Sequence, residues 1–367
     1  MEGQMLLARS TFLIIAWSAI CLDAKAQEYP FIIEQLPQHL QARVNQQAAT
    51  LQVVNVGSVD EYFVDKLKLW NTSSAIRVCF FGGSTELRSR IAGVASQWTE
   101  AGGYLPLDFG SAASPHLCGS NNGRFQIRVG FEYKGYWSTV GTDSENLLTQ
   151  SEQSMNLALF NINPPPEPKF SRIVLHEFGH AIGLQHEHQS YKAPCVNDFD
   201  WNAIYNFLQG DPNYWSIEQI DQNLKPKPST SGNDASRFDV DSIMLYSFPK
   251  EFYKAGVQAA CYTAGNSRIS DKDKEFMRKY YPSSVAAAVA VRNQALIEFN
   301  NRIDALSIDD IAKSVAKISA ARLTSEQVDA PFNIENITGG LGGLLITDSN
   351  NAGDTLNYFD RSQVVTP

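Results

Sequence analysis

The chain has 367 residues, of which 43% are hydrophobic and 19% are charged, so neither intrinsic disorder nor a coiled coil accounts for most of it. Its 39 acidic and 30 basic side chains give a net charge of −9, without a long run of Lys or Arg, which argues against a nucleic-acid partner. We therefore expect a globular protein of two or three domains.

The N-terminal apolar segment predicts a signal peptide rather than a membrane span. The run at 11–22 has twelve residues, fewer than the roughly 20 that a membrane-spanning helix needs. Arg9 precedes the run, and residues 24–26 (Ala-Lys-Ala) supply the small side chains that signal peptidase requires. We expect cleavage after Ala26 and a secreted, extracellular mature protein. A buried N-terminal helix is the alternative interpretation.

Four cysteines remain after removal of residues 1–26, and an even number in an exported chain predicts two disulfides. Four cysteines allow three pairings, which the sequence alone does not distinguish. Their order along the chain favours Cys79 with Cys118 and Cys195 with Cys261. The absence of a CxxC spacing argues against a thiolate metal site.

The predicted regular structure begins after a polar segment. Residues 27–69 are weakly patterned, with a Gln- and Ala-rich stretch at 41–52, and we interpret them as a prosegment or N-terminal arm. Residues 75–81 are rich in strand formers and end at two glycines, which predicts a strand. The next apolar side chains have the spacing of an amphipathic helix, with Ser84 as its N-cap; they are Leu87, Ile91, Val94 and Trp98.

Three further segments, at 125–131, 136–140 and 155–162, have the alternation or the β-branched and aromatic content of strands, which predicts a small sheet. The three prolines at 164–166 end the last strand and lead into the helix that carries the chemistry.

The C-terminal third contains two further helix signals. Ser270 and Asp273 form a capping box before an apolar stripe that ends at Pro282, where we place the end of the main domain. The remaining residues, 283–367, open with an alanine-rich stretch. A second box, Ser307 and Asp310, then precedes a helical pattern made of Ile311, Val315 and Ile318. No site chemistry is evident in this extension.

The most informative stretch is HEFGHAIGLQH at 176–186. His176 and His180 are four residues apart, so on a helix both imidazoles project from one face and can bind one ion. Gly183 follows the last helical turn, where glycine reverses the chain at little steric cost. The reversal would return His186 to the same ion, and Glu177 lies beside the pair.

Three histidines with a fourth position left open are typical of a catalytic zinc site, whereas structural zinc usually has four protein ligands. Zinc lowers the pKa of a water towards about 7, and a carboxylate within reach can take its proton. The pattern predicts Zn²⁺ bound by His176, His180 and His186, with Glu177 as general base. A chance HExxH would instead leave ordinary surface histidines.

The HExxHxxGxxH motif is the metzincin signature, which a Met-turn follows later in the chain. Glu187 directly follows the third histidine, and the sequence SIMLY at 242–246 resembles the Met-turn of the astacins. Residues 135–141 and 269–273 resemble the astacin edge strand and the start of its last helix. From about Trp70 to Pro282 the chain therefore resembles the astacin-like metzincin zinc proteases.

This resemblance implies an α+β zincin fold, with a small twisted mixed sheet, two long helices over an active-site cleft and an irregular C-terminal subdomain that contains the Met-turn. It also implies that Tyr246 is an additional ligand that swings to stabilise the oxyanion, that Met244 forms a hydrophobic floor, and that Glu187 orders the mature domain. A phenol with a pKa near 10 stays protonated at neutral pH and can donate a hydrogen bond to an oxyanion.

Two features depart from the family pattern. Leu245 stands where astacins often have a histidine, and the four cysteines do not follow the usual astacin arrangement. None of these residues is a predicted zinc ligand, so the zinc assignment is unchanged.

We therefore expect a secreted zinc endopeptidase that hydrolyses polypeptides, with its catalytic domain at 70–282 and a C-terminal extension at 283–367. Latency of such a zymogen would need a carboxylate, because residues 27–70 contain no cysteine; the nearest acidic residues are Asp60, Glu61 and Asp65. The alternative is a non-catalytic, zinc-stabilised adhesion or binding module, against which the intact Glu177 argues.

Overall fold

The computed structural model describes residues 34, 36–52, 66–71, 74–119, 123–211, 213–226, 237–308 and 310–323. All of them belong to the second of two units of the chain, which begins at Ile33. The predicted signal peptide and residues 60, 61 and 65 lie outside the described residues. Among the helices that are described, none combines the length and the apolar character needed to cross a membrane.

A five-stranded mixed sheet lies at the centre of the fold, with strand order β2-β1-β5-β7-β6. Neighbouring strands run parallel except β6, which pairs antiparallel with β7 at one edge. The mixed sheet is therefore confirmed. Its strands are β1 (Ile76–Phe80), β2 (Leu107–Asp108), β5 (Ile127–Gly130), β6 (Tyr136–Ser138) and β7 (Met155–Leu157); β3 (Gly110–Ser111) and β4 (Ser114–Pro115) form a separate pair.

The two expected helices share the main apolar core with this sheet, to which Met277 and Tyr280 also contribute. The two helices are α3 (Thr85–Ala95), which continues as a short 3₁₀ helix, η1 (Ser96–Trp98), and α5 (Lys169–Ala181). The helix α3 begins at Ser84, whose hydroxyl accepts a hydrogen bond from the Leu87 amide at 3.2 Å. The indole of Trp98 donates to the carbonyl of Leu175 at 2.9 Å, which joins η1 to α5.

The polypeptide after α5 consists mainly of short helices joined by turns, in agreement with the predicted irregular subdomain. The helix α9 that follows them is capped by the predicted Ser270–Asp273 box. The elements are η2 (Glu187–Gln189), α6 (Cys195–Asp198), α7 (Trp201–Leu208), α8 (Ile217–Leu224), η3 (Lys250–Phe252), η4 (Gly256–Gln258) and α9 (Asp271–Tyr280); α4 (Asp143–Asn146) precedes β7.

Both favoured disulfides are present. Cys79 of β1 is bonded to Cys118, and Cys195 of α6 is bonded to Cys261, each with 5.0 Å between the Cα atoms. The first bond fastens the central sheet to the segment that follows β4, and the second joins two parts of the irregular subdomain.

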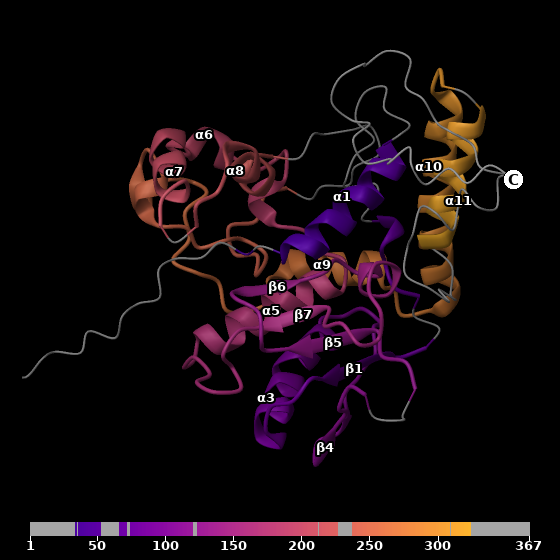
Figure 1. The fold of residues 1–367 in the computed structure, drawn as a ribbon, viewed down its shortest axis with the longest axis horizontal. Helices are drawn as coiled ribbons and strands as arrows, with labels where there is room; N and C mark the ends of the chain where they lie inside the picture. The colour runs from indigo at the N-terminus through magenta and orange to yellow at the C-terminus, as the bar shows by residue number, and fades with distance from the viewer. Residues whose placement is uncertain are drawn as a thin grey trace, which may run out of the picture. The chain divides into compact units, whose positions relative to one another are not determined.

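Three helices flank this sheet-and-helix core in the chain (Figure 1): α1 (Gln38–Gln52) before it, and α10 (Val285–Ala305) and α11 (Asp310–Leu323) after it. The weakly patterned Gln- and Ala-rich stretch is thus helical. The helix α11 packs against both α10 and α1. Of the three residues in its predicted stripe, only Val315 is buried, whereas Ile311 and Ile318 are 40% and 46% exposed.

Candidate metal centre

The helix α5 brings the first two histidines of the motif together. His176 and His180 lie one turn apart and are 8% and 2% exposed, and their ring centroids are 4.9 Å from one another. The opposite side of α5 is anchored in the core by Phe170, Val174 and Phe178, all fully buried. The helix therefore packs by one face and presents its imidazoles on the other.

The end of α5 returns the chain to this imidazole face. The amide of Leu184 donates to the carbonyl of Gly179 at 3.0 Å, and the amide of Gly183 donates to the carbonyl of His180 at 2.8 Å. These two bonds form a Schellman motif, and Gly183 has the φ of +107° that its C′ position requires. As a result His186 lies beside His180, with 2.9 Å between their Nε2 atoms.

The Nδ1 atom of each histidine contacts an acceptor. His176 Nδ1 is 2.8 Å from the Ile243 carbonyl, and His180 Nδ1 is 2.8 Å from the Leu184 carbonyl. His186 Nδ1 is 3.4 Å from Oε1 of Gln189, a 4% exposed side chain whose amide donates to the Gln222 carbonyl. Contacts of this kind fix the orientation of metal-binding histidines and leave Nε2 for the ion.

The predicted Met-turn lies directly beneath α5. A Cβ atom on Gly179 would be only 2.4 Å from Sδ of Met244, so glycine is required for this close approach. The carboxylate of Asp273 holds the turn in place, because it accepts hydrogen bonds from the Ser242 hydroxyl at 2.7 Å and the Ile243 amide at 2.9 Å. The capping residue of α9 thus also positions the floor of the centre.

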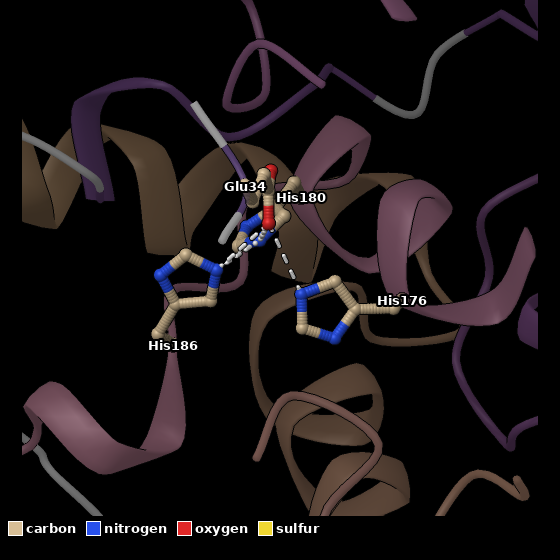
Figure 2. A group of neighbouring side chains, drawn as sticks. All are labelled: Glu34, His176, His180 and His186. Atoms are coloured by element: carbon tan, nitrogen blue, oxygen red, sulfur yellow. Dashed lines mark hydrogen bonds and ion pairs between the residues drawn. The ribbon is translucent and has the colours of Figure 1, made fainter. Parts of the chain in front are cut away.

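A carboxylate that the sequence analysis did not identify completes the centre. Oε2 of Glu34 lies 3.0 Å from Nε2 of His186 and 3.4 Å from Nε2 of both His176 and His180 (Figure 2). Burial alone would raise the pKa of Glu34, but the charge of His180 and hydrogen bonds from the three histidines hold the pKa well below its usual value.

These four side chains fit a zinc ion. Their ligand atoms all lie within 4.8 Å of one another, and ligand atoms about 2.0–2.1 Å from a tetrahedral zinc would be about 3.3–3.4 Å apart. Nε2 of His176 is buried, and its contact with Oε2 of Glu34 is long, at 3.4 Å, and poorly aligned for a hydrogen bond. Three imidazoles and one carboxylate form a donor set that zinc commonly takes.

Glu177 and Tyr246 both lie at this centre. Burial and the charge of Glu34 raise the pKa of Glu177 well above its usual value, and one of its carboxylate oxygens, Oε2, has no hydrogen-bond partner in the described part of the chain. The hydroxyl of Tyr246 donates to Oε2 of Glu34 at 2.7 Å, and its ring centroid is 4.5 Å from that of His186. Burial and the same carboxylate raise the pKa of Tyr246.

Glu187 contacts the segment that leads to the Met-turn. Its backbone amide donates to the Met244 carbonyl at 3.0 Å, and its carboxylate accepts from the Asp239 amide at 2.9 Å. Burial, together with the charges of Asp273 and Asp239, raises the pKa of Glu187 to about 8. Its backbone and side-chain contacts therefore join the third histidine to the turn.

All five sequence-predicted site residues are thus brought together, and Glu34 is the addition. From the sequence, the acidic residues nearest to position 70 are Asp60, Glu61 and Asp65, which lie outside the described residues. No local pattern distinguishes Glu34, which lies 142 residues before His176 in the chain. Only the folded arrangement of the arm reveals its contact with the histidines.

No protein-family model matches this sequence, and no curated protein matches it either. Two structures of myroilysin match: one is 33% identical with a TM-score of 0.48, covering 59% of this chain and 97% of that one. The other is 31% identical with a TM-score of 0.42, covering 59% and 86%. High choriolytic enzyme 1, a hatching-enzyme zinc protease from Oryzias latipes (medaka fish), is 15% identical with a TM-score of 0.39, covering 63% and 100%.

The family assignment rests on sequence. The 33% identity extends over nearly the whole of the myroilysin chain. The chain also carries the complete HExxHxxGxxH signature and the SIMLY turn. The three histidines of the signature lie together in the structure, with Met244 and Tyr246 next to them. Myroilysin is an astacin-family zinc metalloprotease. The chain therefore belongs to the astacin-like metzincin family of zinc metalloproteases.

Proposed function

We propose that the chain is a secreted zinc endopeptidase that is made in a latent form. The observation that carries this proposal is the convergence of three Nε2 atoms on one carboxylate oxygen, with Glu177 and Tyr246 beside them. The leader-like residues 1–26 and the two disulfides support export, because disulfides persist in oxidising compartments. The catalytic domain would be 70–282, between the arm and the C-terminal extension.

His176, His180 and His186 would hold the zinc ion. When bound, zinc polarises the scissile carbonyl and lowers the pKa of a water at the site towards about 7. Glu177 would accept the proton of that water as general base and then donate it to the leaving amine. The phenolic hydroxyl of Tyr246 would donate a hydrogen bond to the oxyanion that develops on the substrate carbonyl.

The strand β6 would bind the substrate. It is the edge strand of the sheet and pairs on one side with β7, and an extended peptide can add to such an edge by main-chain hydrogen bonds. Contact between α5 and β6 supports this role, because α5 carries His176 and His180. A polypeptide is therefore the substrate class that the arrangement favours.

Glu34 would keep the newly made protein inactive. Its carboxylate occupies the position between the three imidazoles where substrate and water must come, and it also engages the hydroxyl of Tyr246. An intact arm would therefore exclude substrate from both the metal and the oxyanion donor. Proteolytic removal of residues 27–69 would expose them.

The proposal is tested with Glu177→Ala. After removal of the arm, the unaltered protein should cleave a denatured protein in a chelator-sensitive way, whereas the variant should lose hydrolysis by several orders of magnitude and retain one zinc per chain by metal analysis. Full activity in Glu177→Ala would refute the mechanism. Stoichiometric zinc without cleavage by the trimmed unaltered protein would instead favour the zinc-stabilised binding module.

A further inference from the structure

The C-terminal helices hold the last residues of the arm, next to the catalytic domain. Ala295, Phe299 and Ile303 of α10 pack with Ala316 and Ala320 of α11 around Leu67, which is fully buried. Leu67 is near the C-terminal end of the arm, so the helix pair contacts the chain at the point where the arm ends. The pair is therefore packed onto the protein and does not extend away from it.

A different face of α11 contacts the arm itself. Val315, 3% exposed, belongs to an apolar cluster with Leu40 of α1 and with the catalytic domain. Leu36, which precedes α1, and Val44 pack against the same cluster; on the helix, Leu40 and Val44 are four residues apart and so lie on one face. The catalytic-domain members of the cluster are Trp137 of the edge strand β6, Leu147 and Leu148. Three parts of the chain thus share one small core.

Polar contacts fix the position of α1 along this core. Arg43 donates to the carbonyl of Leu147 at 3.0 Å and to the carboxylate of Glu152 at 2.8 Å. Gln47, only 1% exposed, donates to Asp143 at 2.9 Å, and Asp143 pairs with Lys68 at 2.8 Å. These directional bonds set the register of α1, whose N-terminus is close in sequence to Glu34.

The arm helix depends on these partners for its order. With 15 residues and few apolar side chains, α1 is at the length where isolated helices are marginal in water. Its helical form therefore comes from packing, and α11 supplies one side of that packing. Loss of the α11 side would expose Leu40 to water and favour detachment of the arm.

We propose that the pair α10–α11 is a clamp that holds the N-terminal arm on the catalytic domain, so that the C-terminal extension helps to keep Glu34 between the histidines. This inference rests on the proposed latency and adds a second element to it. Figure 1 shows α1 beside the pair α10–α11, and α1 packs against α11. Release of the clamp would promote activation even while the arm is still covalently attached.

The clamp is tested by hydrogen exchange on the full-length protein carrying Glu177→Ala, which prevents self-cleavage. Adding Val315→Asp places a charge in the shared core, and the amides of α1 should exchange about tenfold faster or more. Ile318→Asp is the matched control, because Ile318 lies on the same helix and is 46% exposed. Exchange in β1 and α5 should not change in either variant.

A milder variant distinguishes loss of the contact with α1 from unfolding of α10 and α11. Val315→Ala removes two methyl groups and should accelerate exchange of α1 in the same direction but less. If exchange of α1 were the same in both Val315 variants and in Ile318→Asp, the clamp would be overturned. If α10 and α11 lost protection while α1 kept it, the clamp would be overturned as well.

The regulatory consequence is measured separately in chains that keep Glu177. Before any processing, Val315→Asp should hydrolyse a quenched fluorescent peptide faster than Ile318→Asp, by a factor similar to the exchange ratio. Equal initial rates despite faster exchange of α1 would overturn the role of the tail in latency. Failure of every variant to cleave after removal of the arm would refute the proposed protease function, while the exchange result would still decide whether the tail holds the arm.

Discussion

Replacement of Glu34 by glutamine should make the intact chain active. Oε2 of Glu34 accepts from Tyr246 at 2.7 Å and lies 3.0 Å from Nε2 of His186, and hydrogen bonds to charged groups contribute about 1.5–3 kcal/mol each. Glutamine keeps an acceptor oxygen but loses the charge, so we expect about half of the combined value to be lost, about 1.5–3 kcal/mol. At 1.4 kcal/mol per factor of ten, the fraction of chains whose arm has left the histidines should rise roughly 10- to 150-fold.

The assay is the initial rate of hydrolysis of a quenched fluorescent peptide in buffer containing zinc, with mass spectrometry showing that the chain is still uncut. Gln38→Ala is the control, because Gln38 is an exposed residue at the start of the same helix. The reasoning would be refuted if intact Glu34→Gln and Gln38→Ala were equally inactive, while both hydrolysed the peptide at the same rate after removal of the arm.

Three further substitutions test the centre. Gly179→Ala should lower the free energy of unfolding in urea by about 1–2 kcal/mol, because the new methyl group would overlap Met244. Gly93→Ala is the control: this glycine lies in open space on α3, and the substitution should raise the free energy of unfolding by about 0.5–1 kcal/mol. Equal effects of the two substitutions would contradict the contact between Gly179 and Met244. Tyr246→Phe should lower kcat of the trimmed enzyme by about 10²–10³ with zinc content unchanged; an unchanged kcat would remove the tyrosine from the mechanism. Gln189→Leu should raise the zinc dissociation constant roughly 10- to 100-fold in a chelator competition, and an unchanged constant would show that Gln189 does not support the third histidine.

The zinc-binding pattern could be predicted because it depends on short-range geometry. The spacing of His176 and His180 specifies one helical face, and Gly183 signals the reversal that returns the third histidine. The structure adds what the spacing does not contain: the Nδ1 acceptors come from Ile243, Leu184 and Gln189. Two of these acceptors are backbone carbonyls, which no side-chain pattern can reveal.

The connection between the Met-turn and α9 was also beyond sequence reasoning. Ser270 and Asp273 form a capping box, which is a local signal in the sequence. The same carboxylate binds Ser242 and Ile243, about thirty positions earlier in the chain. A capping residue with a second, long-range role has the same sequence appearance as an ordinary one.

The arm and the tail were the least predictable parts because their helices are specified by partners. The stretch 41–52 has little apolar periodicity, and α1 buries only a narrow stripe centred on Leu40. On α11 the small residues Ala316 and Ala320 are fully buried, whereas the larger Ile318 is exposed. Close helix packing selects small side chains here, so the hydrophobic pattern indicated a helix without indicating its buried face.

The position of the clamp determines what a cut in the arm can achieve. Cleavage between α1 and Lys66 would remove the covalent tether but leave the apolar contacts of Leu40 with Val315 and the polar contacts of Arg43 and Gln47 intact. The freed arm would then dissociate at a rate set by these contacts, and dissociation rates vary more than association rates among related interfaces. Because Val315 lies outside both the arm and the catalytic domain, the C-terminal extension can change this rate without altering any residue at the zinc centre.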